Sequence, residues 1–344
     1  MKQYVKSIDS LRIFSILAVL AIHTTTRTLE MTGGTLVSFP LTIFLNQMAR
    51  FAVPLFFVIS GFVLETNFDN SLGYVGFLKK RLSKILFPYI FWSGMYYLFV
   101  YTQNHENFIQ VLLKGNASYQ LYFIPTLCIF YIIFPILHKI YNIISNKIVL
   151  ILLFISQILL LYQDYFVKDF RLADPIHISI LAYFFFIIGI IAARNKEAIS
   201  LFVRKWKYIL LLVTFGSGVY VFFEGLTRFL TTGNYLSYYS QWRPSVLVYT
   251  LLIGSFTFYI FEKNKLQFFL IEKLSRLSFL VFLTHVIVLE TVWSLFGKSL
   301  FFLLKENMLG KVIFDLTFFG VVTGGSFLIA FLLQKIPKLY KVVG

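Results

Sequence analysis

Long apolar runs, each bounded by charged or strongly polar residues, follow one another from end to end of the sequence. A helix needs about 20 apolar residues to cross the roughly 30 Å hydrocarbon core of a bilayer. Since that core offers no water to backbone amides, such runs fold as helices. The sequence therefore predicts ten membrane-spanning helices, at about 9–26, 48–66, 85–102, 119–138, 148–163, 176–193, 208–223, 244–261, 277–297 and 312–334.

The composition supports this interpretation. Hydrophobic residues make up 58% of the chain and charged residues 13%, against about 25% charged in an ordinary soluble domain. These values exclude a soluble enzyme and a disordered chain. Because ten spans and short connectors use up 344 residues, we expect an all-α, polytopic membrane protein. Residues 1–344 would form a single transmembrane domain with no separate soluble domain.

The distribution of basic residues predicts the topology. The net charge is +16, but the cations are scattered over short segments, which argues against a nucleic-acid partner. Placing both termini in the cytoplasm puts 21 of the 31 Lys and Arg residues on that side, as the positive-inside bias requires. Lys2 and Lys6 before the apolar run could also begin a signal peptide. A retained first helix is favoured, because its removal would leave nine spans and invert the charge bias. We expect a multi-pass protein of the plasma membrane.

The first span carries polar groups at membrane depth. Its apolar stretch, residues 13–22, covers only about 15 Å, so His23 must lie within the bilayer, facing a polar cavity. Arg12 and His23 are 11 residues apart, which places them on one helix face about 16.5 Å from each other. Asp9 shares that face. The pattern suits a reaction whose donor enters from the cytoplasm; the alternative is an interfacial Asp9–Arg12 ion pair and a hydrogen-bonded core histidine.

Two further sets of charged residues are candidates. Arg81 and Lys84, just before the third span, are three residues apart and share a helix face, so they could hold the phosphates of an anionic donor. Cytoplasmic topology alone would also explain them. His285 and Glu290 lie at membrane depth in the ninth span. Their spacing separates them by about 140°, so they do not form a pair on one helix face.

Several familiar motifs are absent from the sequence. It contains no phosphate-binding loop of the G-x-x-x-x-G-K-[ST] type, no H-E-x-x-H and no G-x-S-x-G. A single cysteine, Cys128, allows no intrachain disulfide. The five histidines lack metal-ligand spacing, and we expect no metal; they are His23, His105, His138, His177 and His285.

Five sequence blocks, in order, resemble the integral-membrane acyltransferase family 3, which O-acylates surface polysaccharides and related glycans. The blocks are residues 8–12 followed by His23, residues 53–62 ending in Ser60-Gly61-Phe62, residues 81–89, residues 121–125 with Pro135 downstream, and residues 278–285 ending in His285. Two positions depart from the family pattern. Lys84 stands where the family usually has a second Arg, and Tyr122 or Phe123 stands where Trp is frequent.

The resemblance implies transfer of an acyl group, most often acetyl, from a cytoplasmic acyl-CoA such as acetyl-CoA to a sugar hydroxyl. His23 would then be the general base, and Arg12 would orient the donor or stabilise the developing oxyanion. Arg81 and Lys84 would hold the coenzyme A phosphates. The acceptor would be a glycan or a lipid-linked sugar, with membrane lipid and proteins of a polysaccharide pathway as further partners. Candidate substrate-pocket residues are Asp9, Ser60, Tyr122, His285 and Glu290.

Two other functions stay open at this point. Some members of the family are assigned to polysaccharide export, and ten helices around a polar midplane cavity also suit a permease. A carrier, however, does not need a base aligned with a phosphate clamp. A purely structural membrane protein would need neither Arg12 nor His23 along one stripe.

Overall fold

The computed structural model describes residues 5–31, 40–100, 106–168, 171–232, 239–263 and 269–344. Every regular element in these ranges is a helix, so the predicted all-α fold is confirmed. His105 and the predicted loop cations Lys2 and Lys265 lie outside the described residues.

Helices follow one another through the described ranges of the chain. The first half contains α1 (Lys6–Glu30), α2 (Pro40–Met48), α3 (Ala52–Thr66), α4 (Gly73–Met95), α5 (Phe108–Lys114), α6 (Phe123–Lys139), α7 (Tyr141–Ile144) and α8 (Lys147–Tyr162). The second half contains α9 (Ile176–Arg194), α10 (Lys196–Thr232), α12 (Pro244–Lys263), α13 (Phe269–Val292), α14 (Lys298–Leu304), α15 (Met308–Gln334) and α16 (Pro337–Val343). A 3-10 turn (Asn70–Leu72) and π-helical segments (Tyr96–Val100, Gln163–Val167, Trp293–Gly297) complete them.

Each of the ten predicted spans contains a helix. Within the described residues, eight helical stretches are long and apolar enough to cross a membrane. The other two predicted spans correspond to α4 and α6. The first carries four basic residues within its length, and the second is an apolar helix of 17 residues. A multi-pass membrane protein of about ten helices is therefore the architecture.

The predicted boundaries are less accurate than the predicted helices. The second span begins earlier than expected, as two helices, α2 and α3, separated by a break at residues 49–51. Helix α1 continues to Glu30, and α10 covers 37 residues with non-helical backbone at Trp206. The predicted spans end where polar residues begin. A helix continues through such residues wherever their side chains form hydrogen bonds with neighbouring groups or with the helix backbone.

Side-chain caps fix where several helices begin. Asn107, Asn146 and Asn307 accept hydrogen bonds from backbone amides in the first turns of α5, α8 and α15. Asparagine is among the residues best suited to this position, because its carbonyl satisfies an amide that the helix leaves unpaired.

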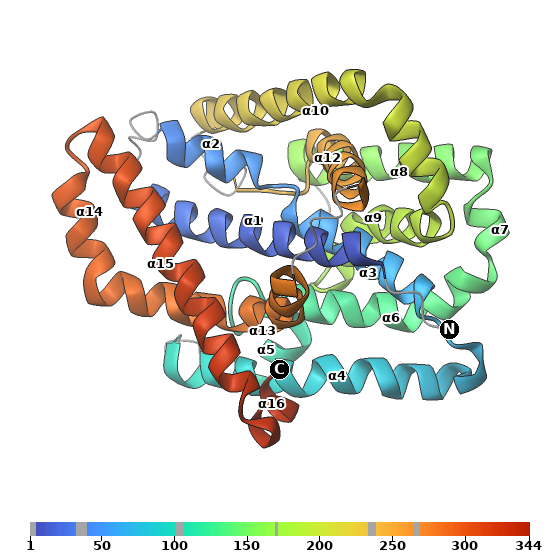
Figure 1. The fold of residues 1–344 in the computed structure, drawn as a ribbon, viewed down its shortest axis with the longest axis horizontal. Coiled ribbons are helices and arrows are strands. Elements are labelled where there is room, and N and C mark those ends of the chain that lie inside the picture. The colour runs from blue at the N-terminus through green and yellow to red at the C-terminus, as the bar shows by residue number, and fades with distance from the viewer. Residues whose placement is uncertain (1–4, 32–39, 101–105, 169–170, 233–238, 264–268) are drawn as a thin grey trace.

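Helix α1 passes through the middle of the bundle, with α10 and α12 above it and α4 below it in the view of Figure 1. It contacts α2, α3, α12, α13 and α15. Its threonines are tolerated there because their hydroxyls donate to backbone carbonyls one turn earlier: Thr24 to Leu20 at 2.9 Å and Thr28 to Thr24 at 3.2 Å. The central place of α1 brings the His23 ring against α13 and against the segment before α6.

Helices α3 and α9 pack backbone to backbone beside α1. A Cβ atom added at Gly61 would meet the carbonyl oxygen of Phe186 at 2.2 Å, and one added at Gly189 would meet that of Val58 at 2.0 Å. Small residues allow such close approach between membrane helices. The contact holds the Phe57 face of α3 against Phe123 at the start of α6, with ring centroids 4.7 Å apart.

Candidate active site

A cavity of about 430 Å³ surrounds His23; we call it the histidine cavity. Helix α1 contributes four polar side chains to it, and the rest come from the α2–α3 break, the segments before α6 and α12, and α13. The polar and ionisable residues that line it are His23, Thr26, Arg27, Glu30, Arg50, Tyr119, Gln120, Tyr122, Tyr239, Gln241 and Glu290.

His23 lies between two rings. Its imidazole centroid is 4.8 Å from that of Tyr119 and 5.1 Å from that of His285, which is fully buried on α13. The Nδ1 atom of His285 lies 2.7 Å from the carbonyl oxygen of Phe282, so Nδ1–H is the donor and Nε2 carries a lone pair. Among the described residues this Nε2 has no hydrogen-bond partner. An acceptor nitrogen is thus buried beside the candidate base.

Arg27 and Glu290 join α1 to α13 at the wall of the histidine cavity. Their side chains form an ion pair at 2.7 Å, and the Arg27 guanidinium also lies over the Trp293 ring, 5.3 Å from its centroid. Glu290 is therefore in the predicted pocket, but its partner there is a cation from α1.

Arg50 is a cavity residue that the sequence analysis did not select. It stands in the break between α2 and α3, is 2% exposed, and donates hydrogen bonds to Asn46 Oδ1 and to the backbone carbonyl of Tyr239. In the sequence, Arg50 is a single arginine directly before an apolar run. Hydropathy alone cannot show the break between α2 and α3 that carries its side chain into the cavity.

A second cavity, of about 480 Å³, contains the predicted phosphate clamp; we call it the basic cavity. Among the described residues that line it, four are cationic and none is acidic: Arg12, Arg81, Lys84 and Arg276. Ser60 lines it too, although its hydroxyl donates to the Phe56 carbonyl at 2.7 Å.

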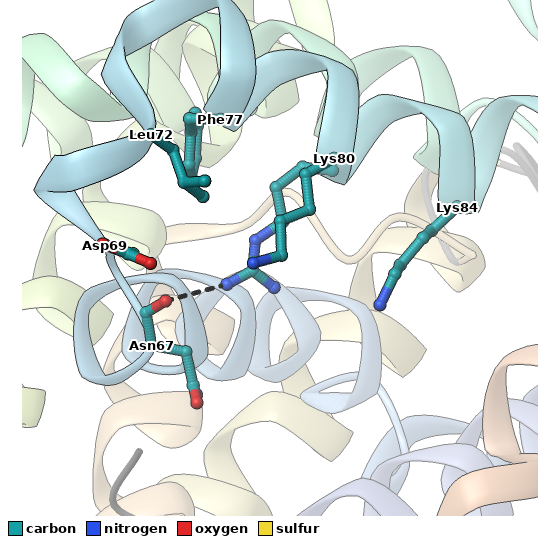
Figure 2. Close-up of a pocket in the computed structure, with 7 residues that line it drawn as sticks. Asn67, Asp69, Leu72, Phe77, Lys80 and Lys84 are labelled. Atoms are coloured by element: carbon teal, nitrogen blue, oxygen red, sulfur yellow. Dashed lines mark hydrogen bonds between the residues drawn. The ribbon is translucent and has the colours of Figure 1, made fainter. Parts of the chain in front are cut away.

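The two clamp residues carry unneutralised charge. Arg81 donates to the backbone carbonyl of Asn67 at 3.2 Å, and neither Arg81 nor Lys84 forms an ion pair with any described residue. Both also line a smaller pocket of about 230 Å³, where Figure 2 shows Lys80 and Lys84 of α4 opposite Asn67 and Asp69 of the segment that joins α3 to α4. Three cationic side chains and one carboxylate, that of Asp69, line this smaller pocket among the described residues, so its net positive charge favours an anionic ligand.

Arg12 lies in the basic cavity and not in the histidine cavity. Asp9 holds it by an ion pair of 3.2 Å, and Asp9 Oδ1 also accepts a hydrogen bond of 2.7 Å from Ser275 on α13. The predicted stripe on α1 therefore faces two cavities in turn. Asp9 is not among the residues that line either cavity, but its ion pair holds Arg12 in the wall of the basic cavity.

Two aromatic rings separate these cavities. Phe123 and Phe282 line both, and their ring centroids are 5.4 Å apart at an interplanar angle of 61°. The basic and histidine cavities are thus consecutive, with this pair of rings as their common wall. Tyr122, the remaining predicted pocket residue, faces the histidine cavity and accepts a hydrogen bond of 2.7 Å from Gln241 through its hydroxyl oxygen.

Comparison with known proteins decides the family. The model of acyltransferase family 3, described as an acyltransferase domain, matches residues 5–335. The chain belongs to this family. The resemblance carried by the five sequence blocks is confirmed, and the protein is a multi-pass membrane member of acyltransferase family 3.

Curated relatives from two species carry the same name, "Probable poly-beta-1,6-N-acetyl-D-glucosamine export protein". The relative from Staphylococcus aureus (strain MRSA252) is 26% identical over 284 residues, which is 77% of this chain and 75% of the relative. The one from Staphylococcus epidermidis is 25% identical over 308 residues, 83% of this chain and 81% of the relative. No solved structure matches the chain.

Proposed function

We propose that this protein is a membrane O-acyltransferase that moves an acyl group, acetyl in the first instance, from a cytoplasmic acyl-CoA to a hydroxyl of a cell-surface or exopolysaccharide sugar. One observation carries the proposal: a histidine cavity and a basic cavity with unneutralised cations lie on either side of one pair of aromatic rings. This arrangement suits a donor whose charged end and reactive end are far apart.

The donor fits this sequence of cavities. Arg81 and Lys84 hold the coenzyme A phosphates, and Arg12 lies in the wall of the same basic cavity. The flexible arm of the donor passes between Phe123 and Phe282 and brings the thioester to His23. Because the clamp belongs to the side richer in Lys and Arg, it faces the cytoplasm in the plasma membrane, with both termini on the same side.

The chemistry is acyl transfer with one proton relayed by His23. Its imidazole accepts the proton of the sugar hydroxyl as the oxygen attacks the thioester carbonyl carbon. The carbon–sulfur bond then breaks, the ester is complete, and the departing thiolate takes the same proton from His23. The lone pair on His285 Nε2 can accept a hydrogen bond from the His23 ring and so select the tautomer that acts as base.

Stabilisation of the oxyanion falls to Arg50 in this proposal. The family resemblance implied either donor orientation or oxyanion stabilisation for Arg12. Arg12 lies on the far side of the Phe123–Phe282 wall from His23, which favours donor orientation. Arg50 lines the histidine cavity and is held by Asn46 and Tyr239, a preorganised cation of the kind that lowers the barrier to acyl transfer.

The test is acyl transfer by the purified full chain in liposomes, with radiolabelled acetyl-CoA and a β-1,6-linked N-acetylglucosamine oligosaccharide as acceptor. We expect His23→Ala to abolish transfer while expression and thermal stability stay unchanged. His138→Gln, a change at a histidine that lines neither cavity, should leave transfer intact. Near-normal turnover by His23→Ala would remove His23 as the base.

Polysaccharide export is the second candidate, because the printed names of the relatives assign it to them. It would require passage of an oligosaccharide across the bilayer without consumption of a thioester. Proteoliposomes loaded with labelled oligosaccharide separate the two functions. Release of sugar that is independent of acyl-CoA and of His23 would favour export; His23-dependent release of coenzyme A thiol would favour transfer.

A further inference from the structure

A third cavity, of about 900 Å³, adjoins the histidine cavity on the side away from the basic cavity. It shares four wall residues with the histidine cavity and, among the described residues, none with the basic cavity. The shared residues are Tyr119, Tyr122, Tyr239 and Gln241. Because Tyr165 and Trp242 add further aromatic rings, we call it the tyrosine cavity.

A carboxylate is held in a fixed orientation in its wall. His177 Nε2 lies 2.7 Å from Asp164 Oδ1, while Nδ1 of the same ring faces the backbone amide of Leu172 at 3.4 Å. Since Nδ1 is the acceptor, Nε2–H is the donor to Asp164. The Asp164 side chain stays 24% exposed, so its second oxygen can accept hydrogen bonds from a ligand in the cavity.

The aromatic groups give the cavity apolar surfaces next to these acceptors. Tyr119 is 46% exposed, and its ring also contacts His23. Trp242 lines the cavity from a mostly buried position. Aromatic rings with polar tips, next to a carboxylate and an amide, suit a sugar, because a pyranose has C–H groups on its faces and hydroxyls around its rim.

The charges in the tyrosine cavity indicate an uncharged ligand. Its two acidic side chains, Asp164 and Asp174, are balanced by two cationic ones, Lys168 and Arg171. The basic cavity, in contrast, is lined by four cations and by no acidic residue among those described; Arg12 and Arg276 are paired with carboxylates outside its lining, and the other two form no ion pair with a described residue. The basic cavity therefore suits an anionic ligand, and the tyrosine cavity suits a neutral one.

We propose that the tyrosine cavity binds the uncharged sugar residues that adjoin the acceptor residue of a glycan, so that an oligosaccharide and not a monosaccharide is the substrate. This inference rests on the proposed function and extends it. One residue of the glycan places its hydroxyl at His23, and its neighbours lie against Tyr119 and Trp242 with a hydroxyl on Asp164. Binding should therefore strengthen with chain length until the cavity is filled.

Calorimetric titration of the full-length protein with β-1,6-linked N-acetylglucosamine oligosaccharides of one to five residues tests the inference without any acyl transfer. We expect the affinity to rise at least tenfold from one residue to three. Asp164→Asn, which keeps the pairing with His177, should weaken trisaccharide binding about tenfold, the effect of losing a hydrogen bond to a charged group.

Asn116→Trp, at an exposed position on the cavity wall, should abolish the length dependence by filling the space. Glu106→Gln, at an exposed carboxylate outside the cavities, is the matched control.

Kinetics provide the second readout. In the transfer assay, Asp164→Asn should raise the KM for the trisaccharide and leave both kcat and the KM for acyl-CoA unchanged. Equal affinity for all chain lengths, or trisaccharide binding by Asp164→Asn and Asn116→Trp equal to that of the unmodified protein, would overturn the inference while leaving acyl transfer intact. Length-dependent binding without any transfer would uphold the subsite and count against the proposed function alone.

Discussion

Replacement of Phe282 by alanine should uncouple thioester consumption from glycan acylation. Phe282 and Phe123 form the wall between the basic cavity of about 480 Å³ and the histidine cavity of about 430 Å³. In the proposed mechanism this wall closes around the donor arm and keeps bulk water from the thioester. Loss of one ring joins the cavities, so water reaches His23 together with the sugar hydroxyl.

The size of the perturbation follows from the volume removed. The missing ring frees roughly 100 Å³, which holds about three water molecules at the ~30 Å³ that each occupies in the liquid. At about 24 cal/mol per Å³, the new cavity alone lowers the free energy of unfolding by about 2.4 kcal/mol, and the lost burial of the ring brings the total to about 3–5 kcal/mol. The backbone carbonyl that Phe282 offers to His285 is unchanged by the substitution. The variant should thus fold, with lower stability, around an intact histidine pair.

The assay compares release of coenzyme A thiol with formation of glycan ester in the same liposomes. For the unmodified protein the two rates should be nearly equal, and without acceptor the thiol release should be slow. For Phe282→Ala, thiol release without acceptor should rise several-fold while ester formation falls. Phe130→Ala is the control, because Phe130 is a buried ring that lines neither cavity and its loss leaves a similar void. Equal thiol release by both variants would refute the assignment of the Phe123–Phe282 pair as the barrier.

Two further predictions concern the clamp and the packing of the bundle. Arg81→Ala should raise the KM for acyl-CoA about tenfold at low salt, because it removes a charge-assisted contact worth about 1.4 kcal/mol. Lys79→Ala, two residues earlier on the opposite side of the same helix and outside the cavities, should leave this KM unchanged. An unchanged KM in both variants would mean that membrane topology alone explains the basic cluster. Gly61→Ala should lower the thermal midpoint in detergent through overpacking on the order of 1–3 kcal/mol, since its Cβ meets the Phe186 carbonyl at 2.2 Å. Gly320→Ala, where nothing lies within 4 Å of an added Cβ, should leave the midpoint unchanged or raise it, and equal midpoints for the two glycine variants would contradict the packing argument.

The helices were predictable from sequence because the bilayer imposes one solution on an apolar run of sufficient length. Their ends were not, because they depend on local contacts. The run of fourteen uncharged, mostly apolar residues after Arg50 predicts α3 correctly, yet hydropathy cannot show that α2 precedes it with a break between them. The polar end of α1 likewise continues as helix because Thr24 and Thr28 satisfy their hydroxyls on its own backbone.

The sequence predicts individual site residues where they lie on one helix, because helical spacing fixes their relative positions. It does not predict which residues from different helices line the same cavity. The three-turn spacing of Arg12 and His23 holds, since both lie on α1 and both line cavities. That a wall from α6 and α13 would divide the stripe between them depends on which helices meet there, and no periodicity in a single segment contains that information. Arg50, Tyr119 and Gln241 were missed for the same reason: each comes from a connection between helices and reaches the cavity only in the assembled bundle.

In the proposed mechanism, the separation of charge from reactivity lets a membrane site use a soluble, highly charged donor. Moving phosphates to mid-membrane depth would cost far more than any pair of arginines returns. Here the cations stay at the opening, with Arg81 fixed to a backbone carbonyl of the segment that joins α3 to α4. Only a neutral arm and its acyl group need to pass Phe123 and Phe282. His23 then requires no charged partner beside it, and its contacts are two rings and an open cavity toward the acceptor side. A thioester on a long uncharged arm meets these requirements, and a compact charged donor such as an acyl phosphate does not.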